Sequence, residues 1–589
     1  MMPIKHFRQI AWVGFGALSV VFHLWLVFSG LVPNLVSRPF HMALVIPWIF
    51  LYKASSGIQR LCDWVIVIIG VSSCLWLAIN HQQLLDQYGF LATSFQTVIA
   101  TTLLLIVLEM ARRSIGWPLP VLAVMALLYG LLGQHVPGEF GHPGTPLASF
   151  LGTMTIAEGG IWGTLTGVSV SIVAIFVIFG AVLNAGEAGA GFMNVAAAAA
   201  GRLRGGAAKV SVLSSALFGS ISGSASANVA STGIVTLPSM IKLGYPKRIA
   251  AAVEAVASSG GQIMPPLMGA GAFVMVELTG IPYSDIIIAA SLPALLYFFA
   301  VWIGVDIFAI QHKLRPLDRD ERPPLTTVFI TASFFLVPFT TLLIVMYIGY
   351  TPQYAAAVAI MAATALLFFN GKLGLRFWVG LTRLFDAVIT AGNQIAMIAS
   401  IILCASIIVG VLGITGLGIK VTSLILSFSG GMIWPALFLT ALACLFLGME
   451  VPTTAAYVIC VSVAGPALID LGMEPLTVHL FVFWYALLST ITPPVCGGVF
   501  IAAGMVGENW LRVAITAMSL GIGLYLIPLG MVVHPELLTV THTPLTSLIA
   551  FGKIAISLGL ISHAVISKSL PILRLAFFML GLALLLITL

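Results

Sequence analysis

The chain contains two segments with the same unusual order of residues, placed far apart in the sequence. In each segment an apolar run leads into a cluster of small residues, a second apolar run follows, and a Pro-Pro pair interrupts a third. The spacing is nearly constant, since Gly219 precedes Gly448 by 229 positions and Pro266 precedes Pro494 by 228. An internal repeat in an apolar chain is typical of secondary transporters.

The composition places the chain in a membrane. Hydrophobic residues make up 60% of the 589 residues and charged residues 7%, against roughly 25% charged residues in a soluble domain. Apolar stretches of about 20 residues, the length that crosses a bilayer as a helix, recur along nearly the whole sequence. We therefore predict an all-α polytopic membrane protein.

The repeated segments interrupt this pattern in a way that lipid restricts. An unpaired backbone group in hydrocarbon costs several kcal/mol, so irregular backbone at membrane depth is tolerated only where it lines a site or cavity. The Gly- and Ser-rich run in the first segment predicts a re-entrant hairpin at about 210–238, and the second segment predicts one at about 432–466. The Pro-Pro pairs predict two broken helices, around 258–266 and 490–494.

The basic residues indicate how these segments are oriented. Lys and Arg gather in alternate connections, which the positive-inside rule assigns to the cytoplasm together with the N-terminus. Basic residues flank the first hairpin at 202–209 and 242–248, whereas the connection at 470–475 after the second hairpin has none. The hairpins are thus expected to enter from opposite sides, as inverted repeats. Arg38 is the exception, because we expect it in a short loop on the outer side.

The chain divides into four predicted regions. Residues 1–115 form a four-helix scaffold whose spans contain no polar cluster, and residues 116–158 add one span and a periplasmic loop. Residues 159–533 contain both repeats, where the transport chemistry is expected. Residues 534–589 add two C-terminal helices of unassigned role.

Opposed hairpin tips near the bilayer midplane predict a particular chemistry. Helix N-termini there carry partial positive charge that attracts an anion, while exposed carbonyls and hydroxyls are the hard oxygen ligands that a sodium ion prefers. The pattern therefore favours co-transport of a small anion with a cation.

Four motifs carry a resemblance to a known family: GSISGSASAN, EAVASSGGQIMPPLMGAGAF, GMEVPTTAAY and HLFVFWYALLSTITPP. At these residues the chain resembles the membrane component of tripartite ATP-independent periplasmic (TRAP) transporters, of the ion transporter superfamily. It is most similar to the fused small-plus-large permease that works with TAXI-type binding proteins. The resemblance implies an elevator mechanism in the bacterial inner membrane, in which a domain holding both hairpins slides against the scaffold. It also implies delivery of the solute by a periplasmic TAXI-type binding protein and uptake driven by an ion gradient.

The resemblance also implies site residues at the matching positions. The expected substrate ligands are Ser222, Ser224, Asn228, Gly260, Gly261, Thr453 and Thr454. The expected ligands of a coupling sodium ion are Ser222, Asn228, Ser258, Ser259, Met264, Thr454, Ser489, Thr490 and Thr492. For any single serine, close packing of helices is an equally good interpretation.

Because of two carboxyl groups, a proton remains the alternative coupling ion. Glu254 fits the family pattern on the first broken helix, whereas Glu450 stands where the family usually has glycine. An ionisable residue at such depth is costly and is a functional hypothesis by default. Either carboxylate could carry a proton, although sodium held by neutral oxygens is favoured.

Other functions are less well supported. A symporter that takes a carboxylate directly from water, without a binding protein, is the nearest rival. An intramembrane serine protease would need one nucleophile and one positioned base such as His479, not a duplicated pair of hydroxyl clusters. The sequence has no phosphate-binding GxxxxGK[ST] motif, which argues against an ATPase. We expect no cofactor and no nucleic acid partner, with membrane lipid and a small organic acid as the other contacts.

Overall fold

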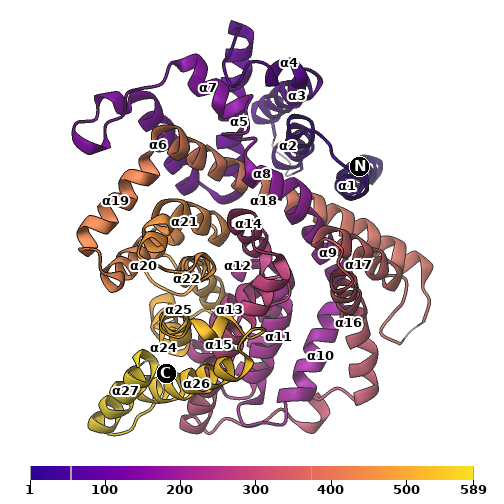
Figure 1. Ribbon diagram of the computed structural model, residues 1–589. Helices are drawn as coiled ribbons and strands as arrows, with labels where there is room; N and C mark the ends of the chain where they lie inside the picture. The colour runs from indigo at the N-terminus through magenta and orange to yellow at the C-terminus, as the bar shows by residue number, and fades with distance from the viewer. Residues whose placement is uncertain (1, 53–55, 373, 588–589) are drawn as a thin grey trace.

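The computed structural model describes residues 2–52, 56–372 and 374–587, and the side chains of residues 2–7, 222, 449 and 450 lie outside its description. The regular elements of this part are helices, apart from one isolated β-bridge between Phe369 and Leu375. In the described residues, 12 helices are long and apolar enough to cross a membrane. The prediction of an all-α polytopic membrane protein is confirmed (Figure 1).

The N-terminal helices form one group around a long central helix. They are α1 (Met2–Phe28), α2 (Asn34–Leu51), α3 (Ile58–Ile79), the short α4 (His81–Leu85) and α5 (Ser94–Ile115). Together with α6 (Pro118–Leu132), helices α1, α2 and α5 pack against α18 (Phe377–Thr415). A loop with the short α7 (Leu147–Thr155) leads from α6 to the first repeat.

These helices do contain buried polar groups, so the expectation of spans without a polar cluster is wrong. His23 Nε2 lies 2.7 Å from His41 Nδ1, and Arg113 Nη2 lies 2.7 Å from Asp63 Oδ1. The partners are 18 and 50 positions apart in the sequence, on different helices. Because one partner of each pair lies on another helix, the sequence of a single span does not reveal the pair.

Arg38 is also placed differently from the expectation. It lies within α2 rather than in an outer loop, and only 8% of its surface is exposed. Its Nη1 donates a hydrogen bond to the carbonyl oxygen of Trp162 and lies 3.9 Å from Glu158 Oε2. A buried, paired guanidinium is not placed by the membrane surface, so Arg38 does not bear on the positive-inside count.

The first repeat contains a pair of packed helices and an interrupted helix. It comprises α8 (Thr164–Val168), the π-helical turn η3 (Ser169–Val173), α9 (Ala174–Ala185), α10 (Ala188–Ala200), α11 (Gly206–Ser222), α12 (Ala225–Lys242), α13 (Lys247–Gly260), the 3-10 turn η4 (Gly261–Ile263), α14 (Gly269–Thr279) and α15 (Tyr283–Gln311). Helices α16 (Leu325–Tyr347) and α17 (Pro352–Leu366) follow the repeat.

The second repeat has the same order of elements. After α18 it comprises α19 (Leu417–Ser429), α20 (Ile433–Glu450), α21 (Thr453–Asp470), α22 (Pro475–Leu487), the 3-10 turn η6 (Leu488–Thr490), α23 (Gly497–Val506), α24 (Trp510–Leu520) and α25 (Ile522–Val533). The chain then adds α26 (Pro544–Ile566) and α27 (Pro571–Leu586). Helix α21 is long enough to count among the 12 candidate spans. Its first residue, Thr453, nevertheless lines a cavity inside the protein.

Local chemistry explains where the two hairpins turn. Gly223, with φ +62°, ends α11 in the left-handed conformation that glycine adopts without strain. The Ser224 hydroxyl then accepts a hydrogen bond from the Ala227 N–H at 3.3 Å and caps α12. In the second hairpin Pro452 immediately precedes α21. Proline has no backbone N–H, so it cannot continue α20, and at a helix start the missing N–H costs nothing because it would have no helical partner.

The two repeats interleave at their broken helices. Helix α13 packs against α23 and α24, and α12 packs against α23. In Figure 1 the N-terminal helices and α24–α27 lie at opposite ends of the molecule, with the hairpins between them. Helix α26 packs on α15, and Gln311 Nε2 donates to the Ile566 carbonyl at 2.9 Å. The C-terminal pair is therefore attached to the repeats.

Candidate functional site

A cavity of about 560 Å³ lies where both hairpin turns and both helix breaks meet. Residues of α12, α14, α21 and α23 form one side. Residues of η3, α9 and α18 form the opposite side. The cavity therefore lies between the hairpins and broken helices on one side and η3, α9 and α18 on the other.

Four helices begin at this cavity. Their first residues, Ala225 of α12, Gly269 of α14, Thr453 of α21 and Gly497 of α23, all line it. The first N–H groups of a helix have no partner within the helix and carry partial positive charge, which makes a helix N-terminus an anion site. Among the described residues that line the cavity, none is Lys, Arg, His, Asp or Glu. The cavity thus attracts an anion without offering it a formal charge.

Five of the residues expected in the site lie on the cavity wall. They are Ser224, Thr453, Thr454, Ser489 and Thr490. Ser259 is adjacent to the wall, because its Oγ lies 2.7 Å from Thr490 Oγ1. The structure therefore brings together hydroxyl oxygens from both repeats, as the repeated motifs predict.

Other expected ligands lie behind the wall and support it. The Asn228 amide nitrogen donates to the carbonyls of Ser215 at 2.9 Å and Ser258 at 3.3 Å, which ties α12 to α11 and α13. Thr492 Oγ1 lies 2.6 Å from Tyr525 Oη, which ties the second break to α25. The cavity lining includes neither Asn228 nor Thr492.

The small residues at the first break allow close packing. A Cβ atom on Gly260 would lie 2.0 Å from a ring carbon of Tyr297, and one on Gly261 would lie 2.5 Å from the Cα of Gly219. Ser258 is fully buried, and Met264 is half-buried in the irregular stretch before Pro265. These residues set the position of the break, and they do not line the cavity.

Two expected residues have side chains outside the described part of the structure. Ser222 is the last residue of α11, and Glu450 is the last residue of α20. Their backbone positions place both beside the hairpin turns.

Glu254 occupies a dense cluster of hydroxyl groups behind the cavity. The side chain is fully buried, and its two oxygens accept hydrogen bonds from five hydroxyls, those of Ser211, Ser215, Thr232, Thr236 and Ser258. These donors come from α11, α12 and α13, so the carboxylate joins all three helices. The position 228 residues later is Val482, so the second repeat has no such group.

One wall residue was missed from the sequence although a signal was present. Gln262 lines the cavity, and its Nε2 donates to the Gly223 carbonyl at 3.0 Å. Its buried Oε1 has no hydrogen-bond partner in the described structure. The offset of 228 positions maps Thr490, which the motifs indicated, onto Gln262, so the repeat itself points to this residue.

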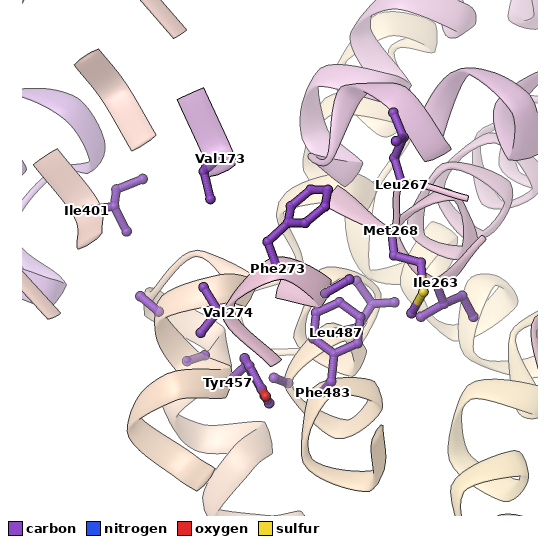
Figure 2. Close-up of a cluster of buried hydrophobic side chains, with 14 of the residues drawn as sticks. Val173, Ile263, Leu267, Met268, Phe273, Val274, Ile401, Tyr457, Phe483 and Leu487 are labelled. Carbon is purple, nitrogen blue, oxygen red and sulfur yellow. The ribbon is translucent and has the colours of Figure 1, made fainter. Parts of the chain in front are cut away.

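The opposite wall is mostly apolar and was also missed. Asn184 of α9 and Gln394 of α18 supply amides among Val, Ile, Met and Phe side chains. Phe176 of α9 stacks on Phe273 of α14, with ring centroids 4.1 Å apart. Figure 2 shows Phe273 between Val173 and Ile401 on one side and the packed residues of the broken helices on the other. For Asn184 and Gln394 the sequence signal is a polar amide side chain within an apolar helix.

The arrangement does not support hydrolysis or a transition-metal centre. His479 Nδ1 lies 2.7 Å from Tyr457 Oη, and the cavity lining includes Ser224 but not His479. A nucleophilic serine requires a base within hydrogen-bond reach. In the described part of the chain, no group of three or more His, Cys, Asp or Glu residues is placed to hold a metal ion.

Comparison with known proteins gives a consistent result. A family model described as the DctM component of tripartite ATP-independent periplasmic transporters matches residues 102–546. The C4-dicarboxylate TRAP transporter large permease protein DctM of Pseudomonas aeruginosa is 25% identical over 379 residues, which cover 64% of this chain and 84% of that protein.

Two further relatives have different named substrates. The isethionate TRAP transporter permease protein DctMQ of Oleidesulfovibrio alaskensis is 24% identical over 362 residues, which cover 60% of this chain and 55% of that protein. The ectoine TRAP transporter large permease protein TeaC of Halomonas elongata is 24% identical over 357 residues, which cover 59% of this chain and 79% of that protein.

Proposed function

The chain belongs to the DctM family of tripartite ATP-independent periplasmic transporters, and we propose that it imports a small organic anion bearing a carboxylate. Family membership makes it a multi-pass inner-membrane transporter rather than an enzyme, working with a periplasmic solute-binding protein. The carboxylate, the coupling ion and the type of binding protein are our inferences.

One observation supports an anionic substrate above the others. Four helix N-termini, two from each repeat, begin at a cavity whose described lining has no charged side chain. Several backbone N–H groups without helical partners are therefore available around one site, since each α-helix leaves about four at its start. A carboxylate accepts such hydrogen bonds on both oxygens. The hydroxyls of Ser224, Thr453 and Thr454 would orient it.

Sodium is our preferred coupling ion. Buried oxygens without a donor lie next to the first break, namely Asn228 Oδ1 and Gln262 Oε1. The Asn228 amide nitrogen faces two carbonyl oxygens, so its orientation is set and its Oδ1 remains the acceptor. Neutral oxygens of this kind suit a hard cation. We infer that they act with the hydroxyls of Ser259 and Thr490 at the helix breaks.

A proton on Glu254 is the alternative coupling ion. Its carboxylate already accepts hydrogen bonds from five hydroxyls. Protonation would replace an acceptor by a donor and displace at least one of them. These hydrogen bonds support an ionised Glu254 that holds the first hairpin, with sodium bound at a separate site.

The packing is compatible with an elevator mechanism. Helices α9 and α18 pack on each other and on helices of the N-terminal group, whereas each hairpin packs on its own broken helix and α12–α14 pack against α21–α24 across the repeats. We propose that the second set moves with the substrate against the first. The family match begins at residue 102, so α1–α4 precede it. We assign residues 1–115 as a fused small-permease scaffold with the N-terminus in the cytoplasm, and the partner as a TAXI-type protein.

The test uses purified protein in liposomes with sodium and proton gradients imposed separately. Labelled four-carbon dicarboxylates and a panel of other organic acids are offered with and without a purified TAXI-type binding protein from the same organism. Uptake that requires both the binding protein and inward sodium supports the proposal. Uptake indifferent to sodium but driven by protons overturns the choice of ion. Equal uptake without the binding protein establishes the independent symporter instead.

A further inference from the structure

A second cavity, of about 330 Å³, lies on the outer side of the second hairpin. Its walls are apolar side chains of α19, α20 and α21. Leu439, Ala443 and Leu447 contribute one helical stripe of α20, Leu424 and Phe428 face them from α19, and Cys460 lies on α21. Within the described residues this cavity is separate from the substrate cavity, since the two share no lining residue.

The apolar cavity is continuous with the surface that faces the membrane. Phe438, Leu442 and Phe446, each one position before a wall residue of α20, are all exposed. Residues four apart share a helix face, so this exposed stripe runs beside the stripe that lines the cavity. Phe428 is 75% exposed at the edge of α19. In a bilayer these side chains contact hydrocarbon.

The apolar walls of this cavity disfavour water. A buried water needs two to four polar partners, and an engineered apolar cavity of about 150 Å³ stays dry and accepts apolar ligands. The wall side chains here are Val, Leu, Ile, Phe, Ala and Cys. We propose that the cavity binds one acyl chain of a bilayer phospholipid, which enters from the adjoining lipid-facing stripe.

The bound chain acts on the second hairpin. Leu447 lines the apolar cavity, and the next residue, Gly448, lines the substrate cavity. Helix α19 is bounded by Gly416 with φ +65° and Gly430 with φ +59°, so it is a short rod between two left-handed glycine turns. Thr422 Oγ1 donates to the Val463 carbonyl at 3.1 Å, which holds α19 against α21 on one side of the cavity. An acyl chain packed between α19 and α20 therefore restrains the hairpin directly behind its tip.

Photolabelling in nanodiscs tests the site. A phosphatidylcholine with a diazirine on one acyl chain is mixed with ordinary phosphatidylcholine at increasing mole fraction, and adducts are located by peptide mass spectrometry. Labelling of Leu439, Leu447 and Cys460 is expected to saturate, whereas labelling of the exposed Phe438 and Phe446 rises in proportion to the probe. Proportional labelling of both stripes would mean bulk lipid only and would overturn the site.

A matched pair of variants tests occupancy of the cavity itself. In Ala443→Trp the added ring fills part of the cavity, so adducts on Leu447 and Cys460 should fall roughly tenfold. Leu442→Trp adds a ring one position away on the exposed stripe and should leave those adducts unchanged. Unchanged wall adducts in Ala443→Trp, or crosslinks of the wall to a second copy of the chain, would reject the acyl chain. If Ala443→Trp does not fold, the saturation curve of the unaltered protein decides alone.

The effect on the hairpin rests on the proposed transport function and has a separate measurement. Uptake by Ala443→Trp in liposomes should differ at least twofold from uptake by Leu442→Trp, because the added ring replaces a mobile chain behind the hairpin tip. Equal uptake with saturable labelling would remove the regulatory role and leave the lipid site intact. Loss of all uptake in the unaltered protein would instead count against the proposed function.

Discussion

Ser259 Oγ and Thr490 Oγ1 lie 2.7 Å apart, although 231 positions separate them in the sequence. Ser259 is one residue before the end of α13, and Thr490 ends the 3-10 turn η6 that follows α22. Each hydroxyl also lies 2.8 Å from a carbonyl oxygen of its own helix, Ala255 for Ser259 and Leu487 for Thr490, so one hydroxyl donates to its carbonyl while the other donates across to its partner. The two broken helices are thus joined at the place where their backbones become irregular, beside the cavity of about 560 Å³.

Thr490→Val should weaken sodium binding with little change in shape. The substitution removes the hydroxyl that bonds Ser259 and faces the cavity. A net loss of about 1 kcal/mol per hydrogen bond corresponds to a roughly fivefold rise in the sodium concentration for half-maximal uptake. The measurement is uptake in liposomes against external sodium at fixed membrane potential.

Thr492→Val is the matched control for this prediction. Thr492 lies two residues further along the same break, but its hydroxyl bonds Tyr525 and does not line the cavity. This variant should lower the thermal unfolding midpoint while leaving the half-maximal sodium concentration unchanged. Equal sodium shifts in both variants would show that the break responds as a whole, and that Thr490 is not a ligand.

Glu254→Gln should loosen the first hairpin. Glutamine keeps the volume, but its amide nitrogen is a donor that faces hydroxyls which now donate to the carboxylate. Charge-assisted hydrogen bonds are the stronger kind, and we expect a loss of about 2 kcal/mol of unfolding free energy. The thermal midpoint in detergent should fall, and a double-mutant cycle with Ser211→Ala should show coupling.

A different outcome for Glu254→Gln would favour proton coupling. If the thermal midpoint is unchanged while proton-driven uptake is lost and solute exchange persists, Glu254 is a proton carrier and not a permanent anchor. Val482 occupies the corresponding position in the second repeat. Val482→Ala therefore serves as the control, because it destabilises the corresponding position of the second repeat without changing a titratable group.

The site could be predicted from the sequence where the repeat itself specifies it. Ser224 and Thr453 are 229 positions apart, and each lies at the first turn of the second hairpin helix. Irregular backbone at membrane depth is tolerated only where it lines a site or cavity, so the interrupted segments alone predicted a cavity at this place. The same offset could have added Gln262, which was missed because it carries neither a hydroxyl nor a charge.

The remaining features depend on contacts that no local pattern encodes. Asn228 matches the family motif but lies behind the wall, because its amide bonds the Ser215 and Ser258 carbonyls of two neighbouring helices. The amides of Asn184 and Gln394 belong to helices outside the repeated motifs and approach the cavity from the other side. Such convergence follows from tertiary packing, whereas periodicity and spacing describe one element at a time.

Gly219→Ala should abolish uptake by displacing the first hairpin. A Cβ atom at Gly219 would lie 2.5 Å from the Cα of Gly261. Because that Cα is a backbone atom, it cannot rotate out of the way as a flexible side chain would. Overpacking of this kind costs about 1–3 kcal/mol or moves the backbone, and the hairpin tip lies four residues away. We expect uptake to fall more than tenfold, as roughly 1.4 kcal/mol suffices for each factor of ten.

Gly504→Ala is the control for the glycine substitution. Gly504 lies in α23, and a Cβ atom there would meet nothing within 4 Å. Alanine should be neutral or stabilising by about 1 kcal/mol, because it favours a helix over glycine. A similar loss of uptake in both variants would mean that helix flexibility, and not the contact between Gly219 and Gly261, limits transport.

The stack of Phe176 on Phe273 gives a test of elevator motion. The rings lie 4.1 Å apart at 23°, and they join α9 of the proposed static part to α14 of the proposed moving part. Since an aromatic pair contributes about 0.5–1.5 kcal/mol beyond its buried area, Phe176→Leu should reduce the population of this state roughly two- to tenfold if the stack exists in this state alone. Distances between spin labels at Ile68 of α3 and Ile515 of α24, both exposed, report that population.

Phe377→Leu is the matched control for the elevator test. Phe377 at the start of α18 stacks on Phe368 just after α17, and both helices pack on α9 of the proposed static part. Weakening that stack should leave the distance distribution unchanged, since both rings stay together in every state of an elevator. A single distance that neither variant alters would show that the two parts do not move against each other. A shift with Phe377→Leu equal to that with Phe176→Leu would instead place the moving boundary elsewhere, between α17 and α18.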